Sequence, residues 1–278
     1  FAHWAGLGYY QRARNLHKAS RIIHHDYQAI FPTTPAELIS LPGIGKSTAH
    51  AILSICKNLP YPILDGNVKR VLSRHFAITK PIDQTPTIKQ LWHLASQVMP
   101  QEDCGIYSQA IMDLGAMVCK KKPLCQLCPV QKSCMAKAKN IHTLLPHKTP
   151  RRKPKCQNVY CLCFFHNNLL FLKRRGETGI WPQLWSPLIE ETPPEESADQ
   201  KSFHLSPFKH ALTHIEMTIF PIIIFASSPP GSGRGQWLCE SKALSAGIPA
   251  AIKKLIMTHR LFHFAKTQAP KSCFVSSE

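Results

Sequence analysis

Apolar residues in the first half of the chain recur at helical spacing. Within several segments they return every three or four positions, which is the period of a helix that buries one face. Thr34 and Glu37 flank a proline at the spacing of a capping box, which predicts that a helix begins there. The clearest helical segments are residues 68–76, 88–95 and 110–117.

The hydrophobic pattern changes in the second half. Short runs rich in β-branched and aromatic residues alternate there with turn-forming segments, and such runs are typical of strands. A closing helix is predicted at residues 248–257. Between the two halves, residues 141–157 hold three prolines, five basic residues and no acidic residue, which predicts an extended linker. The predicted strands are residues 158–165, 168–175 and 214–225.

The chain of 278 residues is therefore expected to form two domains. A helical domain occupies residues 1–140, and a domain built mainly on a β-sheet occupies residues 158–260, with a tail over residues 261–278. The chain opens at Phe1 and not at a methionine, so we expect a fragment that has lost its original start.

Charge narrows the choice of partner. The chain carries 34 Lys and Arg against 16 Asp and Glu, and residues 1–157 hold 22 of these basic side chains but 7 of the acidic ones. Such an excess predicts a polyanionic partner, most commonly nucleic acid, although a merely soluble basic protein is the alternative on charge alone. The longest apolar run, residues 217–226, is far shorter than the about 20 residues of a membrane helix, so no membrane partner is expected.

Two glycines precede one of the predicted helices. Gly43 and Gly45 flank one apolar residue just before a helical segment that starts near Lys46. A tight turn of this kind directs backbone N–H groups outward at a helix N-terminus, where the helix dipole favours an anion such as a DNA phosphate. Gly43, Gly45, Lys46 and Ser47 are therefore expected to contact DNA, with an ordinary turn between two helices as the alternative.

The segment Leu41–Ala49 resembles the helix-hairpin-helix element of DNA glycosylases related to endonuclease III. In the lyase branch of that superfamily, a lysine nucleophile occupies the position that is Ser47 here. An alcohol cannot form a Schiff base. The chain therefore resembles the monofunctional adenine DNA glycosylases, the MutY family, and a lyase is disfavoured.

The segment ILDGNVKRV, residues 63–71, is similar to the catalytic-aspartate segment of that family. Asp65 would cap the following helix, and a fixed carboxylate beside the sugar stabilises the oxocarbenium-like transition state of glycosidic cleavage. Asn67 and Lys69 are expected near the same pocket and in contact with DNA, Asn67 as a polar contact and Lys69 as a cation near the DNA. The family's general-acid glutamate lies upstream of the segment that opens this chain. An impaired DNA-binding or lesion-sensing fragment is therefore the alternative function.

Tyr9 and Arg12 lie in a segment, GLGYYQRARN, that resembles the family segment placing a tyrosine against the damaged pair. A planar ring can enter the base stack while neighbouring cations hold phosphates, which helps to extrude the target nucleotide. A tyrosine buried in the core is the alternative.

Four cysteines fall within 16 residues, with gaps of five, two and five residues between them. Thiolates packed this densely suit a metal or cluster better than disulfides, with zinc as one possibility. The family resemblance implies a structural [4Fe–4S] cluster in the loop 119–134, although its relatives usually have six residues in the first gap. The cysteines are Cys119, Cys125, Cys128 and Cys134.

The second domain resembles the Nudix-like C-terminal domain of the same family. The strand and basic residues at 170–175 and the run GIWPQLW at 179–185 carry this resemblance. No pyrophosphatase carboxylate box is present, so we expect the domain to read a base and not to hydrolyse a nucleotide. Leu212, Thr213 and His214 match the family's lesion-sensing loop, where the threonine hydroxyl could hydrogen-bond 8-oxoguanine.

The combined prediction is a mainly α helix-hairpin-helix glycosylase domain with an iron–sulfur cluster loop, followed by an α+β Nudix-like domain. The resemblance implies a monofunctional glycosylase of base excision repair that removes adenine mispaired with 8-oxoguanine or guanine in double-stranded DNA. It would act as a monomer on the nucleoid in the cytoplasm of a bacterium.

Overall fold

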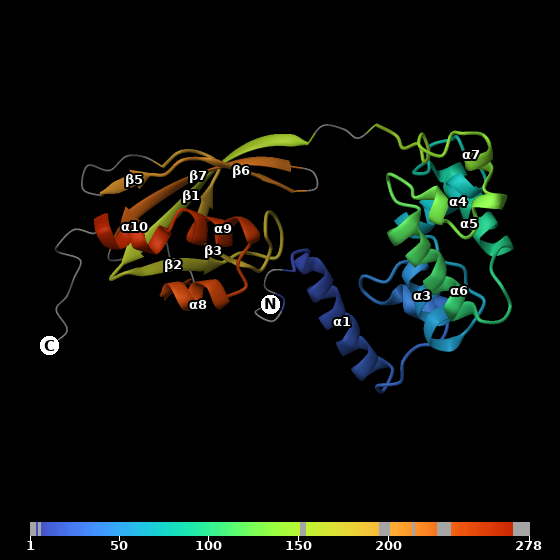
Figure 1. Ribbon diagram of the computed structural model, residues 1–278. Helices are drawn as coiled ribbons and strands as arrows, with labels where there is room; N and C mark the ends of the chain where they lie inside the picture. The colour runs from blue at the N-terminus through green and yellow to red at the C-terminus, as the bar shows by residue number, and fades with distance from the viewer. Residues whose placement is uncertain are drawn as a thin grey trace. The chain divides into compact units, whose positions relative to one another are not determined.

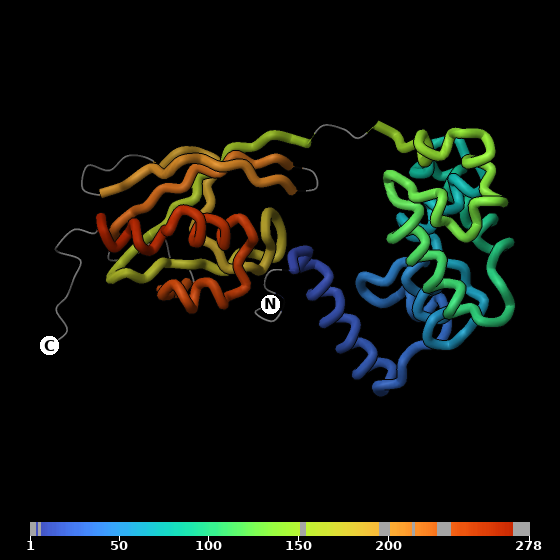
Figure 2. Tube along the Cα trace, viewed as in Figure 1, coloured from blue at the N-terminus to red at the C-terminus, as the bar shows by residue number. Residues whose placement is uncertain are grey.

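The computed structural model describes Trp4 and residues 7–150, 154–194, 201–212, 215–226 and 235–268. The chain divides into two compact units (Figures 1 and 2). The helical unit comprises residues 14–151, and the sheet unit comprises residues 1–13 together with residues 152–278. The division differs from the expected one, because the first thirteen residues group with the C-terminal part of the chain.

The helical unit contains two hydrophobic clusters. One joins Ala19 of α1 to Leu38 and Leu53 of the next two helices, and the other surrounds Val71 and Leu91. The predicted capping box is confirmed, because the Thr34 side chain accepts from the Glu37 backbone N–H and Glu37 bonds back to Thr34. The α-helices in this part of the chain are α1 (Tyr10–Asp26), α2 (Pro35–Ser40), α3 (Lys46–Lys57), α4 (Gly66–His75), α5 (Thr85–Gln97), α6 (Cys104–Asp113) and α7 (Met135–Ala138). The same part of the chain also contains a π-helix, η2 (Leu114–Val118), and the 3₁₀ helices η3 (Cys125–Leu127) and η4 (Gln131–Ser133).

The predicted linker is not extended over its first ten residues. Leu145 is buried, and the Ile82 N–H donates to the His147 carbonyl at 3.0 Å. Asp83 accepts from both the backbone N–H and the hydroxyl of Thr149. Residues 141–150 therefore fold onto the helical unit, because a buried apolar side chain and several hydrogen bonds anchor them.

The sheet unit is built around two long strands, β1 and β7, that run parallel side by side (Figure 1). Within the described residues the sheet has eight strands, with the central order β3-β2-β1-β7-β5. Pro221 lies within β7 but falls between the stretches that pair with β5 and β6, where its missing N–H costs little. The strands are β1 (Lys155–His166), β2 (Leu169–Arg174), β3 (Trp185–Ser186), β4 (Leu188–Glu190), β5 (Ser202–His204), β6 (Phe208–Ala211), β7 (Ile215–Phe225) and β8 (Gly235–Leu238).

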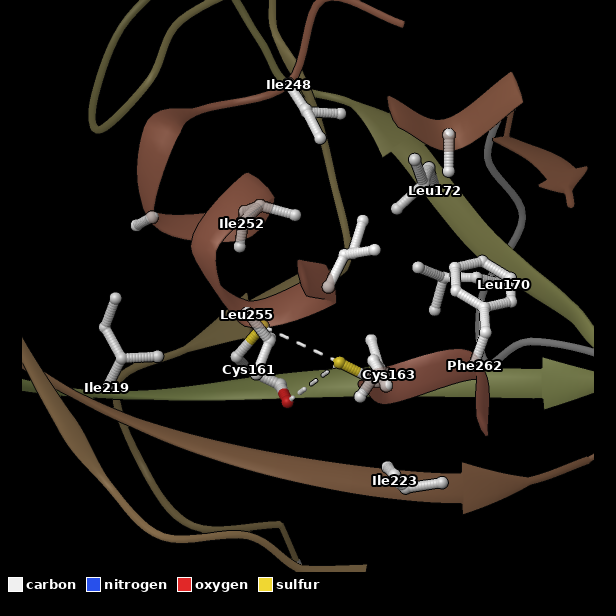
Figure 3. Packing of buried hydrophobic residues seen from close by; sticks show 14 of the residues in the cluster. Cys161, Cys163, Leu170, Leu172, Ile219, Ile223, Ile248, Ile252, Leu255 and Phe262 are labelled. Carbon is white, nitrogen blue, oxygen red and sulfur yellow. Dashed lines mark hydrogen bonds between the residues drawn. The ribbon is translucent and has the colours of Figure 1, made fainter. Parts of the chain in front are cut away.

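Alternate residues of the long strands face opposite sides of the sheet. Cys161 and Cys163 of β1 pack with Ile223 of β7 against the helices on one face (Figure 3), whereas Leu162 and Phe164 belong to a second cluster. The helices that contribute to the first cluster are α8 (Glu240–Ser245), α9 (Ala250–Thr258) and α10 (Leu261–Gln268).

The core continues beyond the predicted boundary at residue 260. Leu261, Phe262 and Ala265 of α10 are buried in the first cluster, so residues 261–268 belong to the sheet unit and are not a tail. The predicted fold class is confirmed: a mainly helical part precedes an α+β part. None of the described helices combines the length and the apolar content that crossing a membrane requires.

Candidate active site and cysteine loop

Asp65 stands at the N-terminus of α4. Its carboxylate Oδ1 accepts the Val68 N–H at 2.8 Å, so the predicted N-cap is confirmed. The two preceding residues, Ile63 and Leu64, are buried in the helical unit and fix the approach of the chain. The half-buried carboxylate is therefore held at the positive end of a helix, where a negative charge is favoured.

Ser47 is tied to the segment that carries Asp65. Its Oγ accepts the backbone N–H of Leu64 at 3.0 Å, which links the first turn of α3 to the residue just before Asp65. The Ser47 hydroxyl oxygen thus serves as the acceptor for the Leu64 N–H, in place of a backbone carbonyl. Ser47 thus acts on the position of Asp65, a contact that the sequence did not reveal.

The glycine turn before α3 is as tight as its sequence suggested. Gly43 adopts a φ of +82°, in the left-handed region that glycine tolerates best. A Cβ on Gly43 would lie 2.7 Å from the Cβ of Asn15. Gly45 is the N-cap of α3 and provides no side chain to cap the first N–H groups. The turn therefore leaves these N–H groups without a capping side chain, as an anion site requires.

Lys46 packs against an aromatic cluster. Its ammonium group lies 4.3 Å from the centroid of the Trp92 ring, and His50 contacts the same ring edge-on. Nδ1 of His50 lies 2.8 Å from the Pro62 carbonyl and must donate to it, because a carbonyl can only accept. Burial is the main cause that lowers the pKa of His50. Lys46 remains a predicted DNA contact, and sequence reasoning missed His50.

A chain of hydrogen bonds connects α4 to the first cysteine. The Asn67 side-chain oxygen accepts from Nη2 of Arg70 at 2.8 Å, and Nε of Arg70 donates to the Cys119 carbonyl at 2.6 Å. Gly115 makes room for Asn67, since a Cβ there would lie 2.6 Å from the Asn67 Cβ. Lys69 is only half-buried, and its described bond is from its backbone N–H to the Asp65 carbonyl.

The four predicted metal ligands are free, half-buried cysteines. Burial raises the pKa of Cys128, the Val130 N–H lowers it, and repulsion from Cys119, Cys134 and Cys125 raises it further. The other three cysteines are thus near enough to disfavour a negative charge on Cys128. Among the described residues, no three His, Cys, Asp or Glu side chains are grouped closely enough to hold a metal ion. The donor set fits an iron–sulfur cluster by its chemistry, because it offers four thiols.

Tyr9 and Arg12 lie in the range of the sheet unit. The Tyr9 side chain is 77% exposed, whereas the neighbouring Tyr10 packs against the core and donates its hydroxyl to the Ile248 carbonyl. The Arg12 guanidinium lies 5.7 Å from the Trp4 ring centroid. Of the two tyrosines, Tyr9 is therefore the one whose ring is available for a ligand.

The lesion-sensing segment is described only in part. Leu212 is half-buried against the sheet-unit core, and its N–H donates to the Ile215 carbonyl at 2.8 Å. Thr213 and His214 lie outside the described residues. His210, just before this segment, packs its ring edge-on to Trp181, and burial together with the Lys254 charge lowers its pKa. His210 could have been noticed as the first histidine of the motif FKHALTH.

The structure brings Asp65, Ser47, Asn67 and the cysteine loop together in the helical unit. Tyr9, Arg12 and Leu212 belong to the sheet unit. The candidate residues therefore fall into two groups, one in each unit.

Known proteins share features of both units. A helix-hairpin-helix motif matches residues 26–55, and a NUDIX domain matches residues 159–258. An adenine DNA glycosylase of Buchnera aphidicola subsp. Schizaphis graminum is 32% identical over 267 residues, which cover 91% of this chain and 77% of that protein. The human adenine DNA glycosylase is 27% identical over 344 residues, covering 98% of this chain and 61% of that protein.

A solved structure of a non-covalent endonuclease III–DNA complex is also similar. It is 27% identical and covers 49% of this chain and 62% of that chain, with a TM-score of 0.41. The present chain spans about three fifths of the human relative and of the endonuclease III chain.

Proposed function

The chain belongs to the adenine DNA glycosylase family, and from this premise we propose that it removes adenine mispaired with 8-oxoguanine or guanine during base excision repair. The observation that carries the proposal is the fixed carboxylate of Asp65, bonded to the Val68 N–H at the start of α4. Its position is supported from α3 by the Ser47–Leu64 bond.

Asp65 would act on the bond between adenine and its sugar. As this bond breaks, its electron pair leaves with the base, and positive charge develops on the anomeric carbon. The carboxylate stabilises that charge. Water then adds its oxygen to the carbon and gives up a proton, which balances the proton that the departing adenine takes up. Ser47 offers no amine, so the reaction stops at an abasic site without a Schiff base.

DNA binding would use the turn at Gly43 and Gly45 together with cationic side chains. The uncapped N–H groups of α3 are suited to a phosphate, and Lys69 is a predicted cation near the backbone. Tyr9 presents an exposed ring that can enter the base stack, with Arg12 as a neighbouring charge. Leu212, Thr213 and His214 would inspect the base opposite adenine.

The four cysteines would hold a [4Fe–4S] cluster that keeps their loop folded. When bound, the cluster supplies structural cross-linking and not glycosidic chemistry. The exposed lysines at 120–122 and Lys132 lie on the same loop and would face the DNA backbone. A monomeric state and a bacterial nucleoid location stay predictions.

A second candidate is DNA binding and lesion sensing without base removal. No glutamate of this sequence matches the motif of the family's general acid. If the acting protein had no group that protonates the departing adenine, cleavage would be slow while binding persists.

Incubation with duplexes that carry adenine opposite 8-oxoguanine, guanine or thymine tests the proposal. Free adenine from the first two duplexes, with strand breaks appearing only after alkali, supports a monofunctional glycosylase. Borohydride trapping should capture no protein–DNA adduct, since a trapped adduct would indicate a lyase. Tight binding of the 8-oxoguanine duplex without adenine release would instead favour the lesion-sensing candidate.

A further inference from the structure

We propose that Arg74 is a positioning residue for the cysteine loop, holding its backbone and supplying the positive charge that faces the Cys119 sulfur. The inference rests on the proposed cluster and goes beyond it, because it concerns how this chain retains the cluster and sets its reduction potential.

The Arg74 guanidinium donates most of its hydrogen bonds to the cysteine loop. Arg74 lies in the last turn of α4 and is only 3% exposed. Nη1 donates to the Lys120 carbonyl at 2.6 Å and to the Cys119 carbonyl at 3.3 Å, and Nη2 donates to the Lys121 carbonyl at 3.2 Å. One planar group thus binds three consecutive carbonyls, which only the fork geometry of arginine allows.

The same side chain reaches the segment that follows the loop. Nε of Arg74 donates to the carbonyl of the buried Leu145 at 2.8 Å. The backbone of Arg74 also approaches the last cysteine, since its carbonyl oxygen lies 3.6 Å from the Cys134 sulfur. Arg74 therefore contacts both the first and the last of the four cysteines.

Among the residues that the structure describes, no carboxylate pairs with Arg74. The ion pair found in the described part of the chain joins Lys209 to Glu216, in the sheet unit. A buried cation that is matched only by carbonyl dipoles is costly, and the cost falls when an anion is added. Nη1 of Arg74 lies 3.3 Å from Sγ of Cys119, so an anionic cluster ligated by Cys119 would bring the matching negative charge beside the guanidinium.

Arg70, one turn earlier on α4, provides an informative contrast. It also donates to the Cys119 carbonyl, but its other contacts are Asn67, Gly66 and Gly115, and no bond to sulfur is described for it. The two arginines therefore have different contacts and different expected roles. Arg70 joins the loop to the Asp65 end of α4, and Arg74 faces the sulfur.

This arrangement has two measurable consequences. An N–H donor and a positive charge beside a ligating sulfur stabilise the more reduced, more negative form of a cluster, so they raise its reduction potential. Fixing three loop carbonyls also preorganises the ligands and slows their release of iron. Removing Arg74 should lower the potential and accelerate iron loss.

The full chain, purified with its iron, allows the test. Arg74→Met removes both charge and fork, Arg74→Lys keeps the charge but not the fork, and Arg21→Met, at an exposed arginine of α1, is the matched control. The readouts are iron and sulfide per chain, the rate of iron transfer to a chelator, and the reduction potential measured by electrochemistry.

We expect Arg74→Met to release iron about tenfold faster or more and to show a more negative potential, because outer partners of metal ligands commonly have effects of this size. Arg74→Lys should release iron faster than wild type, with a potential closer to wild type, and it keeps the test valid if the Met variant fails to fold. Arg21→Met should match wild type. Wild-type release and potential in both Arg74 variants would overturn the inference, whereas wild-type protein without iron would overturn the cluster itself.

Discussion

Replacing Gly43 by alanine tests whether the turn before α3 depends on a left-handed glycine packed against α1. A side chain at the observed φ of +82° costs on the order of 1–2 kcal/mol. The new Cβ would lie 2.7 Å from the Cβ of Asn15, which is fixed to the backbone and cannot rotate away. Overpacking of this kind adds roughly 1–3 kcal/mol. We therefore expect Gly43→Ala to lose about 2–5 kcal/mol of local stability.

Hydrogen exchange measured by mass spectrometry on peptides from α2 and α3 gives the local opening free energy. Gly45→Ala is the matched control, because Gly45 has a φ of −91° and a Cβ added there would meet no other atom within 4 Å. Its expected cost is about 1 kcal/mol or less, the loss from alanine at an N-cap. Adding Asn15→Gly to Gly43→Ala should recover the packing part of the loss and leave the backbone part. Equal protection in Gly43→Ala and Gly45→Ala would refute the reasoning.

Three further results are expected. Ser47→Ala should slow adenine release while DNA binding persists, because the Leu64 N–H loses its acceptor and Asp65 shifts. Single-turnover rates of adenine release check this, and a rate equal to that of wild type would contradict it. Because the pKa of His50 is lowered in the folded chain, the unfolded chain takes up the proton first as the pH falls; the stabilising contribution is complete above about pH 6.5 and is lost as the pH drops towards the folded-state pKa. Denaturant titrations near pH 7 and pH 5 should show a smaller loss of stability in His50→Gln than in wild type. An identical loss in both proteins would count against this reasoning. Duplex binding should weaken roughly a thousandfold or more between about 50 and 200 mM salt, which binding isotherms would show, and salt-independent binding would exclude a phosphate-based interface.

Local signals made part of the structure predictable. The capping box at Thr34 and the N-cap at Asp65 involve partners three residues away, so the sequence alone contains both groups. The long strands β1 and β7 were likewise visible as apolar runs. Their parallel pairing was not, because it joins residues about 60 positions apart through backbone bonds that any side chain can make.

Other features depend on distant partners that no local pattern encodes. Lys46 contacts Trp92, which belongs to another helix. Arg74 would be expected at the surface from its charge alone, and its burial is explained only by the carbonyls of the cysteine loop that accept from it. The helix α10 was missed because its buried residues, Leu261, Phe262 and Ala265, stand among polar neighbours near the end of the chain. Burial of these side chains by the sheet decides their structure, and the sheet is assembled from the whole second half of the chain.

The central claim is that the Asp65 carboxylate supports the breaking of the bond between adenine and its sugar. It is tested most directly by single-turnover adenine release from an 8-oxoguanine:adenine duplex at saturating protein, in which Asp65→Asn is compared with Asp83→Asn. Asp83 is a suitable control because its carboxylate also accepts hydrogen bonds, from the backbone N–H and the hydroxyl of Thr149. The account predicts that Asp65→Asn binds the duplex but releases no adenine, whereas Asp83→Asn releases it at the wild-type rate. Adenine release by Asp65→Asn at the wild-type rate would contradict it.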